Sequence, residues 1–315
     1  MKLHLDKVAF EQIIDEVAKE HAVRRDVLEK DYYVTLLLFE LSNRENQGYA
    51  YFKGGTALYK ALRSIRRFSE DIDLTVFIED CPTPSQSKKR LEQATLKYKS
   101  MPKGETPENE RGSITCEYLY DSMYDIDSSD ALQRFGKVKV EGTSFTVSEP
   151  TMKIEIAPHL YELCTEDRRK ILREYYDVTP FIIETISLER IFIDKVFAAE
   201  FYFEKNEFSD VAKHAYDLTV LLQNEQIKEF LSDTDEVYRI VGLKRKEELI
   251  RKGGVDANLK VADFPYFKKL REVKEFESKF EKMQEIYVLN KNDELTIHEV
   301  LNAIEKLQKI MNIGC

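Results

Sequence analysis

The sequence has few of the residues that form tight turns, with only 11 glycines and 8 prolines among 315 residues. An all-β sandwich or barrel needs more turn residues than this, so we expect helix to dominate. Hydrophobic residues make up 43% of the chain and charged residues 34%, a composition that excludes an intrinsically disordered protein. The length allows one large domain or two.

Long apolar runs and paired cysteines are also missing. The longest apolar run, Tyr32–Phe39, is too short to cross a bilayer, and the charged segment Met1–Lys7 lacks the apolar core of a signal peptide. The cysteines have neither zinc-site nor disulfide-framework spacing, and they lie at Cys81, Cys116, Cys164 and Cys315. We therefore expect a cytoplasmic protein with reduced thiols and no membrane contact.

An excess of positive charge is absent as well. Acidic residues outnumber basic ones by 58 to 48, and the net charge of −10 gives no overall attraction to nucleic acid. Contact with RNA would need a local basic face, for which three clusters are available: Lys88–Arg90, Arg168–Arg173 and Lys244–Lys246. Each cluster has acids nearby, so ordinary solvated charge explains the three clusters as well as RNA binding does.

The chain changes in pattern near Pro180. Before it, apolar residues at helical spacing predict helices over Phe10–Ala18, Arg24–Leu41, Thr56–Arg63 and Lys88–Lys99. Strands are predicted at Tyr49–Lys53, Ile72–Ile78, Ser113–Tyr120, Lys137–Val140, Ser144–Val147 and Met152–Ala157. Beyond Pro180, helices are predicted at Leu188–Glu204, Ser209–Gln223, Leu270–Tyr287 and Thr296–Met311. The fold class is therefore α+β, with a small mixed sheet in a domain of residues 1–178 and a mostly helical domain of residues 179–315.

A glycine pair lies between the strand that ends at Lys53 and the helix that follows it. Gly54 and Gly55 would let the backbone approach a phosphate closely, and the helix N-terminus presents free N–H groups to an anion. Thr56 could cap this helix. A tight strand-to-helix turn explains two glycines equally well, so the pair alone does not establish an anion site.

Two aspartates on the next predicted strand strengthen the signal. Asp71 and Asp73 are two residues apart, so both carboxylates point to the same face of a strand. Converging like charges are unfavourable unless a cation neutralises them, and Mg²⁺ prefers carboxylate and phosphate oxygens. The alternative is a solvated strand end with two surface aspartates.

A third acid is expected in a nucleotidyl-transfer site, and Glu155 is the candidate. If its strand lies beside Ile72–Ile78, Glu155 could complete a two-metal site and take the proton from an acceptor hydroxyl. Glu155 could also face solvent, or form a cross-strand ion pair that involves Lys153 on the same face.

These motifs resemble those of the AbiEii/AbiGii toxin family, nucleotidyltransferase-fold proteins of toxin–antitoxin and abortive-infection systems. Lys53–Thr56 matches the first family motif, Arg67–Asp73 closely matches the second, and Glu29–Thr35 resembles the helix that leads into them. Asp194–Ala198 resembles the third motif. His214–Asp217 keeps only the second aspartate of the fourth, so the role of His214 stays open.

The resemblance implies a Mg²⁺-dependent enzyme that binds a nucleoside triphosphate, GTP in some members, and adds a nucleotide to an RNA acceptor such as tRNA, with release of pyrophosphate. It implies nucleotide contacts by Lys53, Gly54, Gly55, Thr56, Arg67 and Ser69. Together with the argument from the strands, which alone supplies Glu155, it leads us to expect catalytic roles for Asp71, Asp73, Glu155, Lys195 and Asp217, with Asp71, Asp73 and Glu155 as metal ligands. The implied partner is an antitoxin that acts without a stable complex, and we expect a monomer.

Other interpretations stay open. Lys195 lies in an apolar helix, where a buried partner or a bound triphosphate would offset its charge, but it could also extend to the surface. Asp217 shares a helix face with Lys213 and His214, which an ordinary surface ion pair would explain. The whole chain could be a regulatory nucleotide-binding module without transfer activity, or a kinase-type phosphotransferase on the same cradle.

Overall fold

The computed structural model describes residues 1–44, 49–63, 66–105, 107–110, 112–124, 135–144, 149–250, 253–288 and 290–312. The chain divides into two compact units. The first comprises Met1–Val147 and Thr151–Thr185, and the second comprises Ser148–Pro150 and Ile186–Cys315. Among the helices described, none is both long and apolar enough to cross a membrane.

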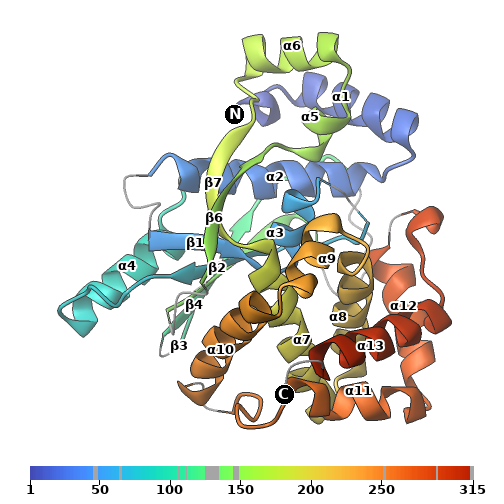
Figure 1. Ribbon diagram of the computed structural model, residues 1–315. Coiled ribbons are helices and arrows are strands. Elements are labelled where there is room, and N and C mark those ends of the chain that lie inside the picture. The colour runs from blue at the N-terminus through green and yellow to red at the C-terminus, as the bar shows by residue number, and fades with distance from the viewer. Residues whose placement is uncertain are drawn as a thin grey trace. The chain divides into compact units, whose positions relative to one another are not determined.

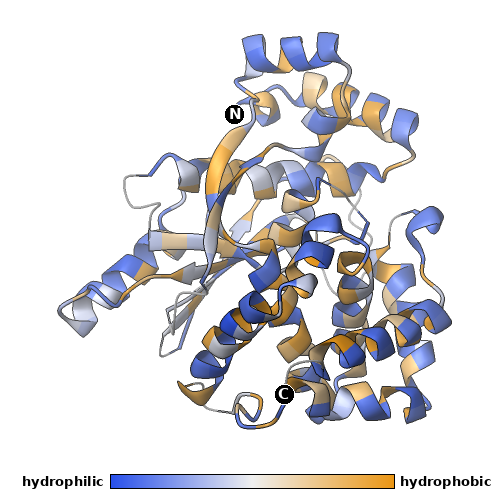
Figure 2. Ribbon diagram, in the orientation of Figure 1, coloured by the Kyte–Doolittle hydropathy of each residue, from blue (hydrophilic) through white to orange (hydrophobic). Residues whose placement is uncertain are grey.

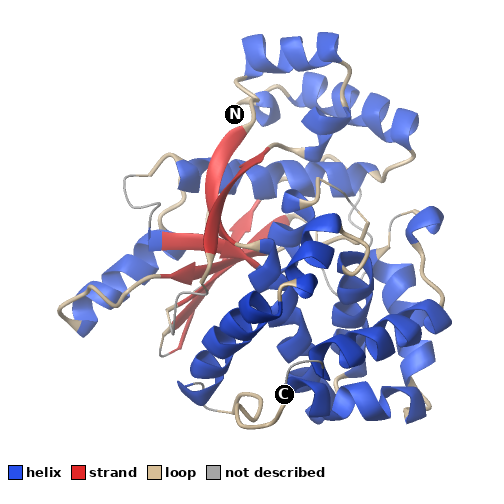
Figure 3. Cartoon of the chain, in the orientation of Figure 1, coloured by secondary structure: helices blue, strands red, loops and turns tan. Residues whose placement is uncertain are grey.

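A seven-stranded mixed sheet forms in the first unit, with strand β7 ending at the unit boundary (Figure 3). The strands are β1 Ala50–Lys53, β2 Ile72–Val76, β3 Glu108–Glu110, β4 Ser113–Leu119, β5 Lys137–Thr143, β6 Thr151–Ile156 and β7 Phe181–Ile186. Their order in the sheet is β3-β4-β5-β2-β1-β7-β6. Strand β2 is antiparallel to β1 and parallel to β5. With the helical remainder of the chain, this sheet confirms the predicted α+β class.

The helices of the first unit are α1 Lys7–His21, α2 Arg25–Ser42, α3 Gly54–Ala61, α4 Pro84–Leu96, α5 His159–Leu163 and α6 Glu166–Tyr176 (Figure 1). Helix α6 is mainly hydrophilic, and Leu172 is its one fully covered apolar residue (Figure 2). Helix α4 begins earlier than the sequence pattern predicts, because the Thr83 side chain accepts a hydrogen bond from the Gln86 N–H and caps it.

The middle of the sheet has one apolar and one polar face, because strands β4 and β5 alternate strictly between buried and half-buried residues. On the apolar face Val138 and Val140 are buried, and helix α4 packs against both strands. Gly142 lies on that face, where a Cβ would be 2.4 Å from Thr95 Cγ2 of α4. The polar face of β5 carries Lys137, Lys139, Glu141 and Thr143.

The second unit is helical, as predicted. Its helices are α7 Leu188–Glu204, α8 Phe208–Leu221, α9 Glu225–Ser232, α10 Thr234–Ile250, α11 Pro265–Lys269, α12 Phe276–Tyr287 and α13 Ile297–Asn312. Helix α8 is central to this unit, because α7, α12 and α13 all pack against it. Arg190 of α7 is fully buried and forms ion pairs with Asp194, at 2.9 Å, and with Glu247.

Two local predictions differ from the structure. Strand β5 continues to Thr143, beyond the predicted end at Val140. Of the predicted strand Ser144–Val147, Ser144 belongs to no strand and residues 145–147 lie outside the described residues. The predicted helix Leu270–Tyr287 is interrupted, and α12 begins only at Phe276. Cys81, Cys116 and Cys164 are free thiols, as expected, whereas Cys315 is not among the described residues.

Candidate functional site

The glycine pair begins helix α3 directly after strand β1. Gly54 has a φ of +80°, and a Cβ at this position would lie 2.1 Å from Asp73 Oδ2. Both the left-handed backbone and the lack of space require glycine here. The prediction that Thr56 caps α3 is wrong, because the helix already begins at Gly54 and Lys53 is its N-cap residue.

The first and second sequence motifs come together around this helix N-terminus. The Thr56 hydroxyl is hydrogen-bonded to Ser69 Oγ at 3.0 Å. A Cβ on Gly55 would lie 2.6 Å from Ser69 Oγ and 3.2 Å from Arg67 Nη2. Arg67 is buried, and its guanidinium lies 5.6 Å from the centre of the Tyr59 ring. The predicted phosphate cradle therefore has hydroxyl and guanidinium groups along one side.

Asp71 and Asp73 lie at the start of strand β2, beside the cradle. Strand β2 begins at Ile72, so Asp71 immediately precedes it and Asp73 is its second residue. Asp73 is directly opposite Lys53 of β1 in the antiparallel register. Lys53 Nζ donates to Thr143 Oγ1 at 3.0 Å, which places this ammonium on the polar face of the sheet.

Glu155 is not on a strand beside β2, and the condition for its proposed role is not met. Strands β1 and β7 separate β6 from β2, and β6 is an edge strand. Glu155 instead lies 3.3 Å from Arg63 in an exposed ion pair and lines a separate cavity of about 500 Å³. The nearby Lys153 pairs with Glu184, at 3.3 Å, rather than with Glu155.

Glu141 is the acid that the sheet brings next to the aspartate pair. Strand β5 is the other neighbour of β2, and Glu141 is directly opposite Asp73 in the parallel register. Lys139, two residues earlier on the same face, pairs with Glu141 at 3.5 Å. The sequence carries a signal for this, because the alternation of Lys137–Val140 continues through Glu141 to Thr143. The predicted strand stopped too early to include Glu141.

The charges on this face strongly influence one another. Burial raises the pKa of Asp73 to about 6, and the neighbouring Glu141 and Asp71 act in the same direction. Burial also raises the pKa of Asp71. Burial alone would lower the pKa of Lys139, but the three carboxylates together raise it above its ordinary value. The site therefore holds its negative charge at a cost that a bound cation would relieve.

Mg²⁺ fits this set of donors. Protein Mg²⁺ sites use one or two carboxylates together with substrate phosphates and water, rather than a full cage of side chains. Across the described ranges, no group of three histidine, cysteine or acidic side chains is arranged to hold a metal ion. Two carboxylates, Asp71 and Asp73, are available as ligands. A triphosphate bound at the glycine pair would supply further oxygens to the same Mg²⁺ ion.

A buried polar network holds helix α3, which begins at the glycine pair, to neighbouring elements of the first unit. Lys60 of α3 is 2.7 Å from Asp31 of α2 and donates to the Ala157 carbonyl at 2.9 Å. Asp31 also accepts the His159 backbone N–H at 2.7 Å. Burial alone would raise the pKa of Asp31, but His159 and Lys60 hold it below its ordinary value. Helix α3 is thus held to α2 and to the start of α5 by ionic contacts rather than by apolar packing alone.

Lys195 and Asp217 form a buried ion pair within the second unit. Lys195 Nζ of α7 is 2.6 Å from Asp217 Oδ2 of α8, and the two side chains are 6% and 0% exposed. Lys195 is therefore not a surface lysine, and Asp217 is not in a surface pair with Lys213, which contacts Asp210 instead. His214 stacks on the Tyr202 ring at 5.4 Å.

If the aspartate pair and the cradle catalyse phosphoryl transfer with Glu141 as the general base, Glu141→Gln should lower the transfer rate by about 10²–10⁴-fold, whereas Glu155→Gln should leave it nearly unchanged. The reason is that only Glu141 faces the aspartate pair. Initial rates with saturating NTP compare the two variants, which carry the same chemical change on different strands. A larger loss in Glu155→Gln than in Glu141→Gln would contradict the assignment.

A family comparison agrees with these motifs. The sequence model of the family described as "Nucleotidyl transferase AbiEii toxin, Type IV TA system" matches residues 36–302. No curated protein and no solved structure gives a significant match.

Proposed function

We propose that this chain, which belongs to the AbiEii nucleotidyl transferase toxin family, transfers a nucleotide from an NTP such as GTP to a hydroxyl of an RNA acceptor such as tRNA. The acceptor oxygen forms a bond to the α-phosphorus, the bond from that phosphorus to the β-phosphate oxygen breaks, and pyrophosphate leaves. Mg²⁺, when bound, would supply charge neutralisation on the phosphates.

One observation carries the proposal: the Asp73 carboxylate lies against the glycine cradle, in the space that a Gly54 side chain would occupy, and the Asp71 charge acts on it from two residues earlier. In this proposal Asp71 and Asp73 hold the metal, and residues 53–56 with Arg67 and Ser69 hold the triphosphate. Glu141 takes the proton of the acceptor hydroxyl, since it is the further acid beside Asp73. Positioning and charge neutralisation supply most of the catalysis of such reactions.

Two features of the proposal come from the family rather than from the geometry. One is a catalytic role for Lys195 and Asp217. The other is a cognate antitoxin that counteracts the protein without a stable complex. Both stay predictions, as do the monomeric state and the cytoplasmic location.

Incubation with each labelled NTP, Mg²⁺ and total cellular RNA tests the reaction. We expect label in RNA and release of pyrophosphate in equal amounts. Release of a nucleoside diphosphate instead would indicate a kinase, and NTP binding without any labelled product would indicate a regulatory module.

Expression of the protein without an antitoxin is expected to arrest growth of a bacterial host, and Asp71→Ala should abolish the arrest. The physical reason is turnover, because each added nucleotide inactivates one acceptor and the enzyme continues. Growth curves at matched levels of soluble protein measure this effect. Normal growth with the unaltered protein would contradict the toxin assignment while leaving the transferase assignment to the labelling experiment.

A further inference from the structure

A second cavity of the first unit lies at the opposite ends of the two strands that form the cradle. It has a volume of about 570 Å³, within the range of roughly 300–1,000 Å³ that is typical of small-ligand pockets. Ala50 and Val76, which pair with each other where β1 starts and β2 ends, both line it. Lys53 and Asp73 pair at the other ends of the same strands. The cavity is therefore separate from the proposed catalytic site.

The walls combine an apolar surface with an aromatic ring and a guanidinium. Leu41 and Ala94 line the cavity together with Ala50 and Val76. Arg90 lies over the Tyr49 ring, 3.7 Å from its centre, and both residues belong to the lining. Proteins hold unstacked nucleic-acid bases against such apolar surfaces, aromatic rings and guanidinium planes.

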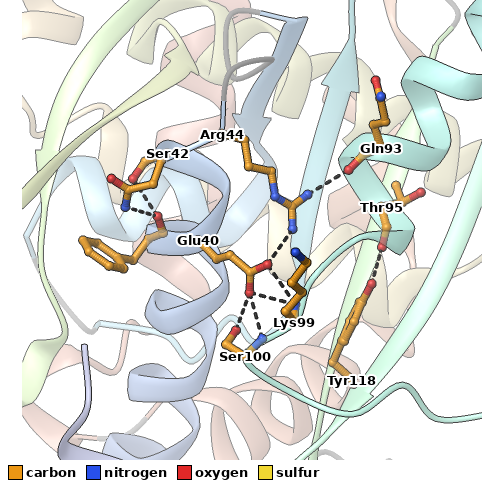
Figure 4. Close-up of polar contacts among 10 residues, drawn as sticks. Glu40, Ser42, Arg44, Gln93, Thr95, Lys99, Ser100 and Tyr118 are labelled. Atoms are coloured by element: carbon orange, nitrogen blue, oxygen red, sulfur yellow. Dashed lines mark hydrogen bonds and ion pairs between the residues drawn. The ribbon is translucent and has the colours of Figure 1, made fainter.

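Among the described lining residues, the rim of the cavity has four basic side chains, Arg44, Arg90, Lys97 and Lys99, and one carboxylate, Glu40. Arg90 is paired with Asp80, which does not line the cavity. Figure 4 shows that Glu40 is engaged by its neighbours. It accepts the Lys99 N–H at 2.8 Å, the Ser100 N–H at 2.9 Å and the Ser100 hydroxyl at 2.7 Å, and it pairs with Arg44 at 3.1 Å. Burial would raise the pKa of Glu40, but these hydrogen bonds hold it below its ordinary value.

The ammonium groups of Lys97 and Lys99 are accessible to an anionic ligand. Both side chains are exposed, and neither forms an ion pair with any described residue. Glu40 fixes the backbone at Lys99 instead of neutralising its ammonium. Two exposed lysines beside an apolar and aromatic cavity, one of them with its backbone held by Glu40, are suited to a ligand with phosphate groups and a flat apolar body.

The other basic clusters are largely occupied by acids. Arg168 forms a bidentate contact with Glu20 at 2.6 and 2.8 Å, and Arg173 pairs with Glu166 at 2.6 Å. In the second unit, Lys244 pairs with Glu248 at 2.6 Å. A phosphate would have to displace these carboxylates, as it would at Arg44 and Arg90 of the cavity rim, which pair with Glu40 and Asp80. The cluster at Arg168 is therefore a poorer RNA contact than Lys97 and Lys99.

We propose that this cavity binds a nucleotide of a single-stranded RNA segment, with the base against Tyr49, Arg90 and the apolar wall, and with phosphates at Lys97 and Lys99. The inference rests on the proposed function in one respect, the RNA partner. It adds an RNA contact outside the catalytic site, and the contact carries no sequence readout because phosphate and stacking contacts accept any base.

The test measures binding of a short labelled single-stranded RNA by fluorescence anisotropy, without NTP, over a range of salt concentrations. In Lys97→Gln/Lys99→Gln the affinity at low salt should fall. The negative slope of log K against log [salt] should become shallower by about 1.4, which is about 0.7 for each lost phosphate contact. The matched control is Lys88→Gln/Lys89→Gln, the same charge change on α4 outside the cavity. Its slope should be unchanged.

A second variant tests the stacking contact separately. Tyr49→Leu should weaken RNA binding about tenfold at every salt concentration and leave the slope unchanged. A competing free nucleoside monophosphate should displace RNA only weakly, since it offers one phosphate where the strand offers two. An unchanged slope in Lys97→Gln/Lys99→Gln, or an equal fall in the control, would overturn the proposal.

Binding is measured in the Asp73→Asn background as well, so the result does not depend on transfer. RNA binding with these properties, but no labelled RNA product from the unaltered protein, would remove the proposed function and leave the cavity assignment standing. Labelled product from the unaltered protein, with an unchanged salt slope in Lys97→Gln/Lys99→Gln, would overturn the cavity assignment and leave the proposed function standing.

Discussion

Asp73→Asn is expected to abolish nucleotide transfer and, at the same time, to stabilise the metal-free fold. Asparagine keeps the shape of the side chain but removes one of the two charges beside the Gly54 cradle. Loss of one group that stabilises the charge of the transition state costs about 10²–10³-fold in rate, and Asp73 would supply such stabilisation through the metal ion that it helps to hold. Initial rates of labelled RNA formation measure the effect.

The stabilisation follows from the raised pKa of Asp73. This carboxyl ionises near 3.8 in the unfolded chain but near 6 in the folded protein. Between these values the native state binds more protons than the unfolded state, so the free energy of unfolding falls as the pH rises through this window. Below about pH 4 the Asp73 carboxyl does not lower the free energy of unfolding. Above about pH 6 this penalty is complete, on the order of 2–3 kcal/mol. Asp73→Asn removes the penalty.

Thermal melts without metal at pH 4 and pH 7.5 should therefore show a gain for Asp73→Asn only at the higher pH. Added Mg²⁺ should raise the melting temperature of the unaltered protein more than that of the variant, because ligand binding to the native state stabilises it. Asp121→Asn is the matched control, since Asp121 forms an exposed pair with Lys7 at 2.6 Å and should respond weakly. Transfer retained in Asp73→Asn would refute the assignment of the site.

The cradle and the aspartate pair could be predicted because their geometry is local. Strand β1, helix α3 and strand β2 follow one another closely, and a period of two residues is enough to place Asp71 and Asp73 on one face. The structure adds that Gly54 has no room for a side chain against Asp73. That close approach depends on the β1–β2 register, which spacing alone does not provide.

The third acid could not be predicted because it depends on the order of strands in the sheet. Glu155 and Glu141 both lie on alternating segments, and nothing local indicates which segment pairs with β2. Strand β5 takes that position, and β6 lies at the far edge. The end of β5 was missed since Gly142 interrupts its apolar face, where helix α4 needs the space. The Lys195–Asp217 pair is likewise formed by two different helices, 22 residues apart.

Lys195→Met alone is expected to destabilise the second unit by about 3–5 kcal/mol, because it leaves the Asp217 carboxylate buried without the ammonium at 2.6 Å. Asp217→Asn should have a similar cost for the converse reason. Either single variant could therefore lose activity through unfolding, and neither by itself tests a role in NTP binding. Chemical denaturation followed by far-UV circular dichroism measures the cost.

The double variant Lys195→Met/Asp217→Leu removes both charges together and is expected to recover most of the lost stability, since buried ion pairs can often be replaced by apolar residues of similar volume. The double-mutant cycle, closed with the single variants Lys195→Met and Asp217→Leu, should give a coupling energy of more than about 3 kcal/mol, because each single variant costs about 3–5 kcal/mol and the double variant costs little. Lys213→Met is the matched control: its pair with Asp210 at 3.0 Å is partly exposed, so less than about 1 kcal/mol should be lost.

The folded double variant then separates a catalytic role from a structural one. If Lys195 contacts the triphosphate, as the family resemblance implies, the double variant should melt like the unaltered protein but bind NTP at least tenfold more weakly. If the pair only joins α7 to α8, NTP affinity and transfer should both return with stability. Titration calorimetry with a non-transferable NTP analogue decides between these outcomes, because it measures binding without turnover in a protein whose fold has been verified.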